Sequence, residues 1–346
     1  MRAVTFANYG PPEVLRLGEV PTPQVDRGDV LVRIVSAGVC RHDVLHRAGK
    51  LPGSPAGAIL GHEIAGYVEQ IGPEVTSIKS GDRVVVFHKL VCGVCDSCID
   101  GRVDLCRSQK RLGTDASGGY AECIVVPQQN VIGIPDNVSM NAAALAVCPM
   151  GASLRALRAA GAELGMTVAI VGAAGGLGVH QVQLASSMGL RVIAITRSAK
   201  WSDQLAELGA EMSLIAPEGD FARQVKSVTG GEGVDIVLDN VISSTFEASL
   251  RSLGLGGVCV VLGNLEVRDI QVRPGLLIYR RLRIVGSGTP TKRDVRDVLT
   301  LLAMGKVKPV IAEELPLSMA AMAHEWIERG GRFGRFVLHP EDAMVS

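Results

Sequence analysis

The stretch TVAIVGAAGGLGVHQVQLA, residues 167–185, predicts the fold of the middle of the chain. It reads as a buried apolar strand, a glycine-rich turn and a helix with apolar residues at helical spacing. Gly175 and Gly178 would let the backbone approach a pyrophosphate closely, and the helix N-terminus would attract its charge. The turn departs from the G-x-G-x-x-G pattern, but it stands at the first strand-helix junction of a longer series. The positions expected to contact a nicotinamide dinucleotide are Gly172, Gly175, Gly176, Leu177 and Gly178.

The alternation of strand and helix continues beyond this stretch. Apolar strands are predicted at 191–196, 234–241, 256–264 and 282–288, with helices between them. Repeated β-α-β units with nearly all-apolar strands indicate a doubly wound parallel sheet, the α/β class. From Arg2 to about Val126 the chain instead shows short runs separated by Gly and Pro, typical of a mostly antiparallel β domain. The tail from about Thr291 predicts one helix, irregular segments and a closing strand.

Length and composition narrow the classes of partner. A chain of 346 residues suits two domains. Its 35 basic and 35 acidic residues balance, so a small-molecule substrate is favoured over nucleic acid or a membrane surface. The N-terminus is a poor secretory signal, and we expect a cytoplasmic protein. Leu164–Leu190 carries no Asp, Glu, Lys or Arg and could span a bilayer by length, but its glycines and His180 fit a buried strand, turn and helix better.

Four cysteines fall within the loop 92–106, spaced C-x2-C-x2-C-x7-C. They are Cys92, Cys95, Cys98 and Cys106. A structural zinc site takes four thiolates in a tetrahedron, and two-residue gaps let one tight loop supply them. A disulfide pair and an iron–sulfur cluster are the alternatives, although the bacterial ferredoxin run needs its fourth Cys closer and followed by Pro. In a reducing compartment this spacing favours structural zinc.

A second metal site is suggested by three residues that are far apart in the sequence, Cys40, His62 and Cys148. Singly, a buried Cys or His is more often a core residue. Together, two thiolates and one imidazole would leave zinc a fourth position for water or substrate, which is the pattern of a catalytic site. Asp43 is placed to accept the other ring N–H of His62. Glu63 is expected behind the metal and is included among the candidate ligands.

Several motifs together resemble the zinc-containing medium-chain alcohol dehydrogenases. They are G-H-E-x2-G-x5-G from Gly61 to Gly72, the four-cysteine loop, Cys40 with Asp43 three residues on, and Cys148. The resemblance covers essentially the whole chain. It implies a GroES-like catalytic domain over 1–146 and 290–346, a Rossmann domain over 147–289, two zinc ions, and a homodimer or homotetramer. The implied reaction interconverts an alcohol and an aldehyde or ketone by hydride transfer with NAD(P)(H).

The sequence specifies less clearly how the ribose of the cofactor that carries a 2′-hydroxyl or 2′-phosphate is bound. An NAD-preferring Rossmann domain places Asp or Glu about twenty residues after the turn, and this chain has none there. Thr196 stands at that place, followed by Arg197, Ser198 and Lys200, which could bind a 2′-phosphate; a solvated turn is the alternative. We therefore expect a preference for NADP(H). Arg335 resembles the family's late arginine, which touches the pyrophosphate.

One departure from the family pattern opens a second function. The family normally has Ser or Thr two residues after its first Cys ligand, to pass the alcohol proton outward, and this chain has His42. His42 could relay a proton, with His46 as an outside candidate. The segments around Cys40, Cys148 and 280–311 also resemble acryloyl-CoA reductases, which reduce an activated C=C with NADPH. A non-catalytic zinc- and nucleotide-binding protein is the third alternative; a nucleic-acid-binding ribbon is poorly supported because the loop lacks stacking aromatics.

Overall fold

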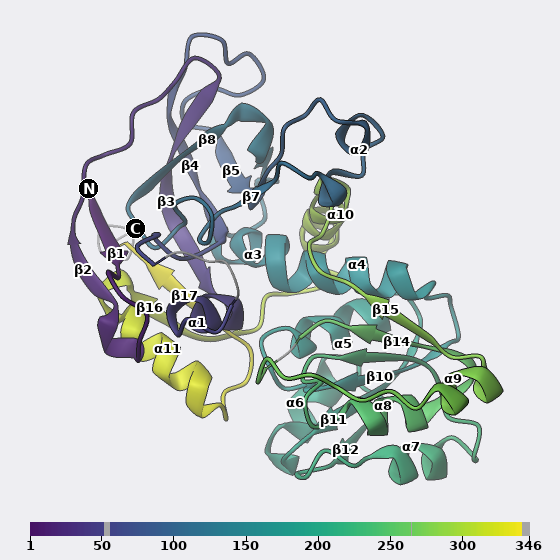
Figure 1. Cartoon of the computed structure of the whole chain (residues 1–346). Coiled ribbons are helices and arrows are strands. Elements are labelled where there is room, and N and C mark those ends of the chain that lie inside the picture. The colour runs from purple at the N-terminus through teal and green to yellow at the C-terminus, as the bar shows by residue number, and fades with distance from the viewer. Residues whose placement is uncertain (52–55, 264, 341–346) are drawn as a thin grey trace. The chain divides into compact units, whose positions relative to one another are not determined.

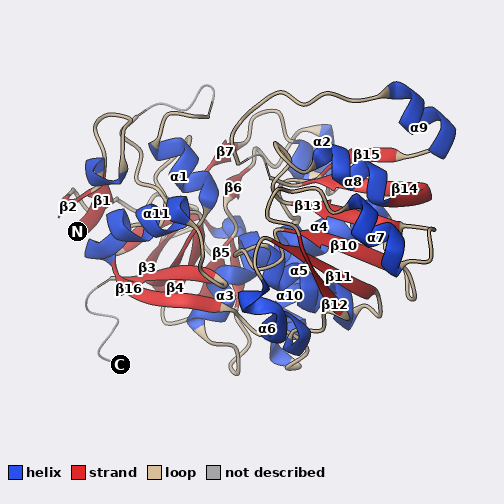
Figure 2. Cartoon of the chain, turned by 90° about the horizontal axis from the view of Figure 1, so that it is seen from below, coloured by secondary structure: helices blue, strands red, loops and turns tan. Residues whose placement is uncertain are grey.

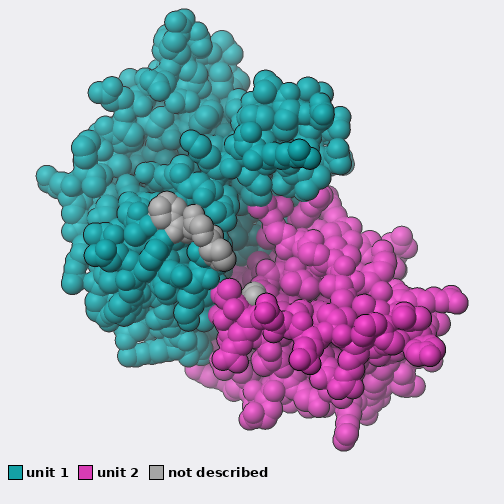
Figure 3. Space-filling model, viewed as in Figure 1, with its two compact units in different colours: residues 1–151, 290–346 teal, residues 152–289 magenta. Residues whose placement is uncertain are grey.

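The computed structural model describes residues 1–51, 56–263 and 265–340, and these form two compact units (Figure 3). Unit 1 comprises residues 1–151 and 290–346, and unit 2 comprises 152–289. The sequence placed the boundary between 146 and 147. It lies after Gly151 because the helical run that holds Cys148 packs in unit 1 until that residue. Cys148 therefore belongs to the same unit as Cys40 and His62.

Unit 2 is built on a parallel sheet. In its described part, six strands pair in the order β12-β11-β10-β13-β14-β15, all parallel (Figure 1). The strands are β10 (Thr167–Val171), β11 (Arg191–Thr196), β12 (Met212–Ile215), β13 (Val234–Asp239), β14 (Leu253–Val261) and β15 (Arg283–Gly286). All five residues of β10 are buried, as expected of a central strand covered on both faces. This order makes unit 2 a Rossmann domain, with the strand order reversing between β10 and β13, where such sheets bind ligands.

The helices of unit 2 lie before and between these strands along the chain (Figure 2). They are α4 (Gly151–Ala160), α5 (Gly178–Ser187), η5 (Ala199–Trp201), α6 (Ser202–Glu207), α7 (Ala222–Val228), α8 (Phe246–Ser252) and α9 (Pro274–Arg280). Leu164–Leu190, long enough to span a bilayer, is divided into β10, the glycine-rich turn and α5. Among the described residues, one helical run, Met140–Ala160, is long and apolar enough to cross a membrane. Of its apolar 18-residue stretch, 83% is buried inside the protein.

Unit 1 is mostly antiparallel. Within the residues described, its main sheet has the order β16-β17-β3-β4-β5-β9, with β8 also on β3, and only β16 and β17 pair in parallel. The strands are β3 (Asp29–Val39), β4 (Glu63–Ile71), β5 (Arg83–Val86), β8 (Cys123–Pro127), β9 (Val131–Gly133), β16 (Ile311–Pro316) and β17 (Arg335–His339). Two small sheets pair β1 (Arg2–Thr5) with β2 (Arg16–Glu19) and β6 (Lys89–Leu90) with β7 (Lys110–Arg111). Because β17 pairs with β3, the C-terminal segment completes the unit formed by the N-terminal one.

The helices of unit 1 hold Cys148 and Asp43 of the candidate site. They are η1 (Pro12–Val14), α1 (Arg41–Arg47), α2 (Asp96–Ile99), η2 (Val103–Leu105), η3 (Gln128–Asn130), α3 (Met140–Leu145), η4 (Ala146–Met150), α10 (Lys292–Ala303), η6 (Leu317–Met319) and α11 (Ala320–Arg329). The sequence predicted irregular structure where α11 lies, and that prediction was wrong. The segment AAMAHEWIER is rich in good helix formers and is followed by two glycines, signals that define this helix.

Candidate active site

Four side chains converge at one place in unit 1. The ligand atoms of Cys40, His62, Glu63 and Cys148 all lie within 4.8 Å of one another. Cys40 follows β3 and caps α1, His62 immediately precedes β4, and Cys148 lies in η4. His62 and Glu63 are buried, whereas both cysteines are partly exposed. The structure thus brings together the residues that the sequence predicted as one metal site.

Cys148 occupies an irregular turn of an otherwise helical run. The stretch η4 is a π-helix between α3 and α4, and it contains Pro149. Proline has no N–H to donate, so the regular α-helical hydrogen bonding cannot continue past it. Single π-turns are often found at functional sites, where they redirect a side chain. The wider turn therefore sets the direction of the Cys148 sulfur within a buried helix.

Asp43 orients two of the candidate ligands. One of its carboxylate oxygens accepts the backbone N–H of Cys40 at 2.9 Å, and the other accepts from Nδ1 of His62, also at 2.9 Å. With Nδ1–H engaged, the lone pair of Nε2 is left for a metal. Although burial lowers the pKa of His62, Asp43 and the Cys40 sulfur raise it well above its usual range. The surroundings of this ring therefore favour a positive charge.

A buried ion pair lies beside the cluster. The Glu63 carboxylate accepts from Nε of Arg335 at 3.1 Å and from a terminal nitrogen of the same guanidinium. That guanidinium also lies 3.9 Å from the Cys148 sulfur. Burial raises the pKa of Glu63, while Arg335 lowers it. These contacts place Arg335 at the cluster, and its contact with a pyrophosphate stays a prediction.

The two sulfurs are close enough to interact. A hydrogen bond donated by the Cys148 thiol to the Cys40 sulfur lowers the pKa of Cys40 well below its usual range and raises the pKa of Cys148. Two sulfurs that share a proton can be bridged by a divalent cation that displaces it. Two thiolates and an imidazole are ligands typical of zinc, and this donor set fits that ion.

Two further imidazoles flank His62. The rings of His42 and His88 each lie 5.5 Å from the His62 ring. Burial lowers the pKa of both, and Nδ1 of each has no hydrogen-bond partner among the described residues. Sequence reasoning assigned nothing to His88. It arrives here because Val86 of β5 pairs with Ile64 of β4, a register that spacing alone does not reveal.

His46 lies elsewhere. It is fully buried, and its Nδ1 donates to the carbonyl oxygen of Gly113 at 3.1 Å. Its ring packs edge-on against Phe6 and at a tilt against Tyr9. These contacts are those of a core histidine, so they give no support to the proton relay considered for it.

The four-cysteine loop forms a second cluster. The sulfurs of Cys92, Cys95, Cys98 and Cys106 all lie within 4.8 Å of one another; the first two cysteines precede α2, Cys98 lies within it and Cys106 follows η2. Backbone N–H groups of Val94 and Cys95 lower the pKa of Cys92 to about 6. All eight cysteines of the chain are described, and all are free thiols. The loop therefore has the composition and spacing of a closed, four-thiolate zinc site.

The predicted cofactor turn joins β10 to α5 in unit 2. The backbone N–H of Gly175 donates to the carbonyl of Gly172, and Gly176 accepts from the His180 ring. Leu177 caps α5, which begins at Gly178. A Cβ at position 178 would lie 2.4 Å from the Gly172 carbonyl oxygen, so only glycine fits this close approach. The turn has the compact form that dinucleotide-binding sheets use at this junction.

The residues expected near a 2′-phosphate follow β11. Thr196 is buried at the strand end, and its hydroxyl donates to the carbonyl of Ser198 at 3.3 Å. Arg197 is exposed. The Lys200 ammonium lies 4.3 Å from the centre of the Trp201 ring, a cation–π contact that sequence reasoning missed. The turn therefore presents two positively charged side chains, Arg197 and Lys200, and the second packs against the Trp201 ring.

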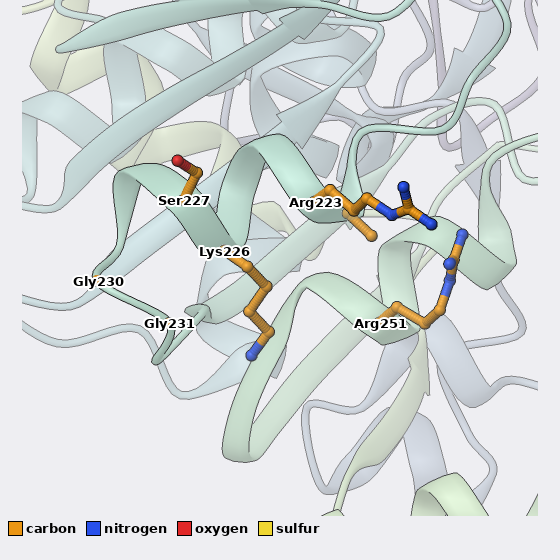
Figure 4. A pocket seen from close by; sticks show the side chains of 7 residues that line it. Arg223, Lys226, Ser227, Gly230, Gly231 and Arg251 are labelled. Atoms are coloured by element: carbon orange, nitrogen blue, oxygen red, sulfur yellow. The ribbon is translucent and has the colours of Figure 1, made fainter.

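The hollow in Figure 4 is separate from these residues. It is lined in unit 2 by α7 and its neighbours, namely Ala222, Arg223, Lys226, Ser227, Gly230, Gly231 and Arg251. The Lys226 ammonium donates to two backbone carbonyls, and Arg251 binds the Asp220 carboxylate. These cations are already engaged in holding α7 and α8, so the hollow contributes nothing to the candidate site.

Two family models match the chain. The alcohol dehydrogenase GroES-like domain matches residues 26–136, and the zinc-binding dehydrogenase model matches residues 176–304. An alcohol dehydrogenase of Geobacillus stearothermophilus is 35% identical over 340 residues, which cover 98% of this chain and 99% of that protein. An acryloyl-coenzyme A reductase of Sulfurisphaera tokodaii is 30% identical, covering 96% and 98% of the two chains. An NAD-dependent alcohol dehydrogenase of the same organism is 31% identical, covering 98% and 100%.

Solved structures agree with these matches. The crystal structure of AibC superimposes with a TM-score of 0.91 at 39% identity, covering 98% of this chain and 96% of that one. Identity of this order over nearly the whole length shows common descent rather than a shared fold alone. The chain belongs to the zinc-containing medium-chain alcohol dehydrogenase family and is an oxidoreductase.

Proposed function

We propose that this oxidoreductase interconverts an alcohol and an aldehyde or ketone by hydride transfer to and from NAD(P)(H), at a zinc site formed by Cys40, His62 and Cys148. The observation that carries the proposal is the convergence of these ligand atoms within 4.8 Å, at two cysteine residues that are partly exposed. A zinc ion held there would keep a fourth position open, lower the pKa of an alcohol and polarise a carbonyl.

The chain's own groups prepare this chemistry. Asp43 fixes the His62 tautomer, so that Nε2 would be free to bind the ion. The Glu63–Arg335 pair sets a cation 3.9 Å from the Cys148 sulfur, which stabilises a thiolate there. The four-cysteine loop would hold a second zinc with no open position, and its role would be to make the lobe rigid.

We propose NADP(H) as the preferred cofactor. Support comes from the exposed Arg197 and from Lys200 at the end of β11, where no carboxylate is present to bind a ribose 2′-hydroxyl. Because one relative is named an NAD-dependent alcohol dehydrogenase, the affinities for NADPH and NADH must be compared directly. Titration with NADPH and NADH would test the proposal, and tenfold tighter NADH would contradict it.

A second function is favoured by one residue. His42 stands where the family normally has a hydroxyl that passes the alcohol proton outward, and its Nδ1 has no partner among the described residues. Reduction of an activated C=C, as in the relative named acryloyl-coenzyme A reductase, sends hydride to the β-carbon and needs no such proton path. An NADPH-dependent enoyl-thioester reductase is therefore the alternative.

Steady-state assays separate the two functions. The zinc-loaded protein would be given primary and secondary alcohols, their aldehydes and ketones, and acryloyl- and crotonyl-CoA, with both cofactors. We expect turnover of alcohols and carbonyl compounds. Turnover of the thioesters alone would refute the first function and establish the second.

We also propose a homodimer or homotetramer in the cytoplasm. Strand β15 has a free edge in the described sheet, and the exposed side chains of Ile278 and Tyr279 lie on the neighbouring α9. An unpaired edge of this kind can pair with a second copy. Eight free thiols suit a reducing compartment. Light scattering of the purified protein would test the assembly, and a monomer at micromolar concentration would contradict it.

A further inference from the structure

A chain of buried hydrogen bonds leads away from the proposed zinc site to the C-terminal helix. We infer that Tyr120 and His324 are positioning residues of this site, holding Asp43 in the orientation that aims both His62 and Cys40 at the metal. The inference rests on the proposed metal site. It adds two residues that neither the motifs nor the ligand spacing singled out.

Asp43 is the centre of the chain. Its side chain is fully buried, and a carboxylate without water needs protein donors. One oxygen accepts from His62 Nδ1, and the other accepts from the backbone N–H of Cys40 and, at 3.3 Å, from the Tyr120 hydroxyl. The Tyr120 hydroxyl is a side-chain donor to that second oxygen. Its removal would take one donor from the oxygen.

The directions of these bonds follow from counting protons. A phenol has one hydrogen, and the ionised Asp43 can only accept, so Tyr120 donates to Asp43. The contact of 3.2 Å between the Tyr120 oxygen and His324 Nε2 must then be an N–H donated by His324. That leaves Nδ1 of His324 as an acceptor, and Nδ1 is the atom without a partner among the described residues. Burial lowers the pKa of His324 to about 4, consistent with a neutral ring.

Tyr120 is also attached to the ligand segment by its backbone. Its N–H donates to the carbonyl of Leu60, and Gly119 donates to the carbonyl of Gly61, both at 2.9 Å. A Cβ at Gly61 would lie 2.5 Å from Cδ1 of the Tyr120 ring. The ring therefore lies directly against the residue before His62. A shift of Tyr120 would be transmitted to the ligand by both routes.

His324 brings the C-terminal helix into the network. It is fully buried in α11, which packs against α1 (Figure 1). Its ring meets the Tyr120 ring edge-on, with centroids 5.8 Å apart and planes at 76°. Since α1 carries Asp43 and is capped by Cys40, the interface between α1 and α11 joins the helix next to a candidate ligand to the helix that carries His324.

The test measures metal binding rather than turnover. Tyr120→Phe removes one hydroxyl and keeps the ring. Zinc dissociation constants would be measured by chelator competition on the full chain, where the four-cysteine loop serves as an internal reference. We expect the affinity of one ion to fall about tenfold, the lower end of the effect of residues that orient metal ligands, and the loop ion to be unchanged. The visible bands of the cobalt-substituted protein should shift with it.

Matched variants separate positioning from packing. Tyr67→Phe removes a hydroxyl from β4, where the ring lies under the Arg33 guanidinium, and should change neither ion. His324→Leu should act like Tyr120→Phe, whereas His324→Gln, whose amide can donate in place of Nε2–H, should restore most of the affinity. The double variant Tyr120→Phe, His324→Leu should lose no more than Tyr120→Phe alone, because both act through one hydroxyl.

Two results would overturn the inference. If Tyr120→Phe and His324→Leu lower the unfolding temperature but leave both zinc affinities and the cobalt spectrum unchanged, the network is structural only. If the wild-type chain binds zinc in its loop alone, the proposed function fails and this inference with it. A protein that binds two ions, depends on Tyr120 and turns over none of the substrates would contradict the proposed reaction and leave this inference standing.

Discussion

Replacing Gly178 by alanine tests the cofactor turn at its tightest point. The added Cβ would lie 2.4 Å from the Gly172 carbonyl oxygen and 2.6 Å from Cα of Ala173. Both are backbone atoms, so no change of rotamer relieves the contact and the turn itself must move. Overpacking of this kind costs about 1–3 kcal/mol. Alanine regains about 0.5–1 kcal/mol over glycine within a helix, so we expect a net loss of about 0–2.5 kcal/mol of unfolding free energy.

The larger effect should be on the cofactor. A displaced turn no longer matches the pyrophosphate, and we expect the NADPH dissociation constant to rise at least about tenfold, equivalent to about 1.4 kcal/mol. Nicotinamide fluorescence titration measures the NADPH dissociation constant, and thermal unfolding measures the loss of unfolding free energy. Gly275→Ala is the control, since its Cβ would meet only the Tyr279 ring at 3.8 Å. Cofactor binding by Gly178→Ala at the wild-type affinity would show that the pyrophosphate does not lie on this turn.

Three further results are expected. Arg197→Ala and Lys200→Ala should each weaken the binding of NADPH about tenfold, the value of a hydrogen bond to a charged group, and change the affinity for NADH by less than about twofold. Equal losses of affinity for both cofactors in titrations would contradict the assignment of these residues to a 2′-phosphate. Cys92→Ser should release the loop zinc and lower the unfolding temperature, as metal analysis and calorimetry would show, whereas an unchanged zinc content would leave the loop without a metal role. His42→Ser should raise the rate of alcohol oxidation in steady-state assays, because a hydroxyl at this position can carry the alcohol proton. The rate of enoyl-thioester reduction should not change. A slower alcohol oxidation would show that His42 itself is needed.

The sequence was most informative where one short segment contains a whole site. The strand, turn and helix at 167–185 predict the Rossmann sheet, and the structure confirms a parallel order around β10. The four-cysteine loop is equally local. Cys40, His62 and Cys148 were predicted from the zinc-binding character of their side chains and from motif resemblance, since no periodicity relates residues so far apart.

The supporting residues could not be predicted because tertiary contacts create them. His88 reaches His62 through the register of β4 and β5. His324 reaches Asp43 only because α11, expected to be irregular, packs on α1. The contact of Arg335 with the pyrophosphate stays a prediction, and β17 sets its guanidinium against Glu63, a contact that the sequence did not predict. Cys148 lies in unit 1 rather than in the Rossmann unit because the boundary falls after Gly151, within the helical run that holds this cysteine.

Zinc content is the most direct test of the catalytic metal site. The wild-type chain and Cys148→Ala would be purified with zinc present, desalted and analysed by inductively coupled plasma mass spectrometry. The two clusters of sulfur ligands predict two zinc ions per wild-type chain and one in the variant, which keeps the loop ion. Two ions retained by a folded Cys148→Ala protein, or one ion in the wild type, would contradict a zinc held by Cys40, His62 and Cys148.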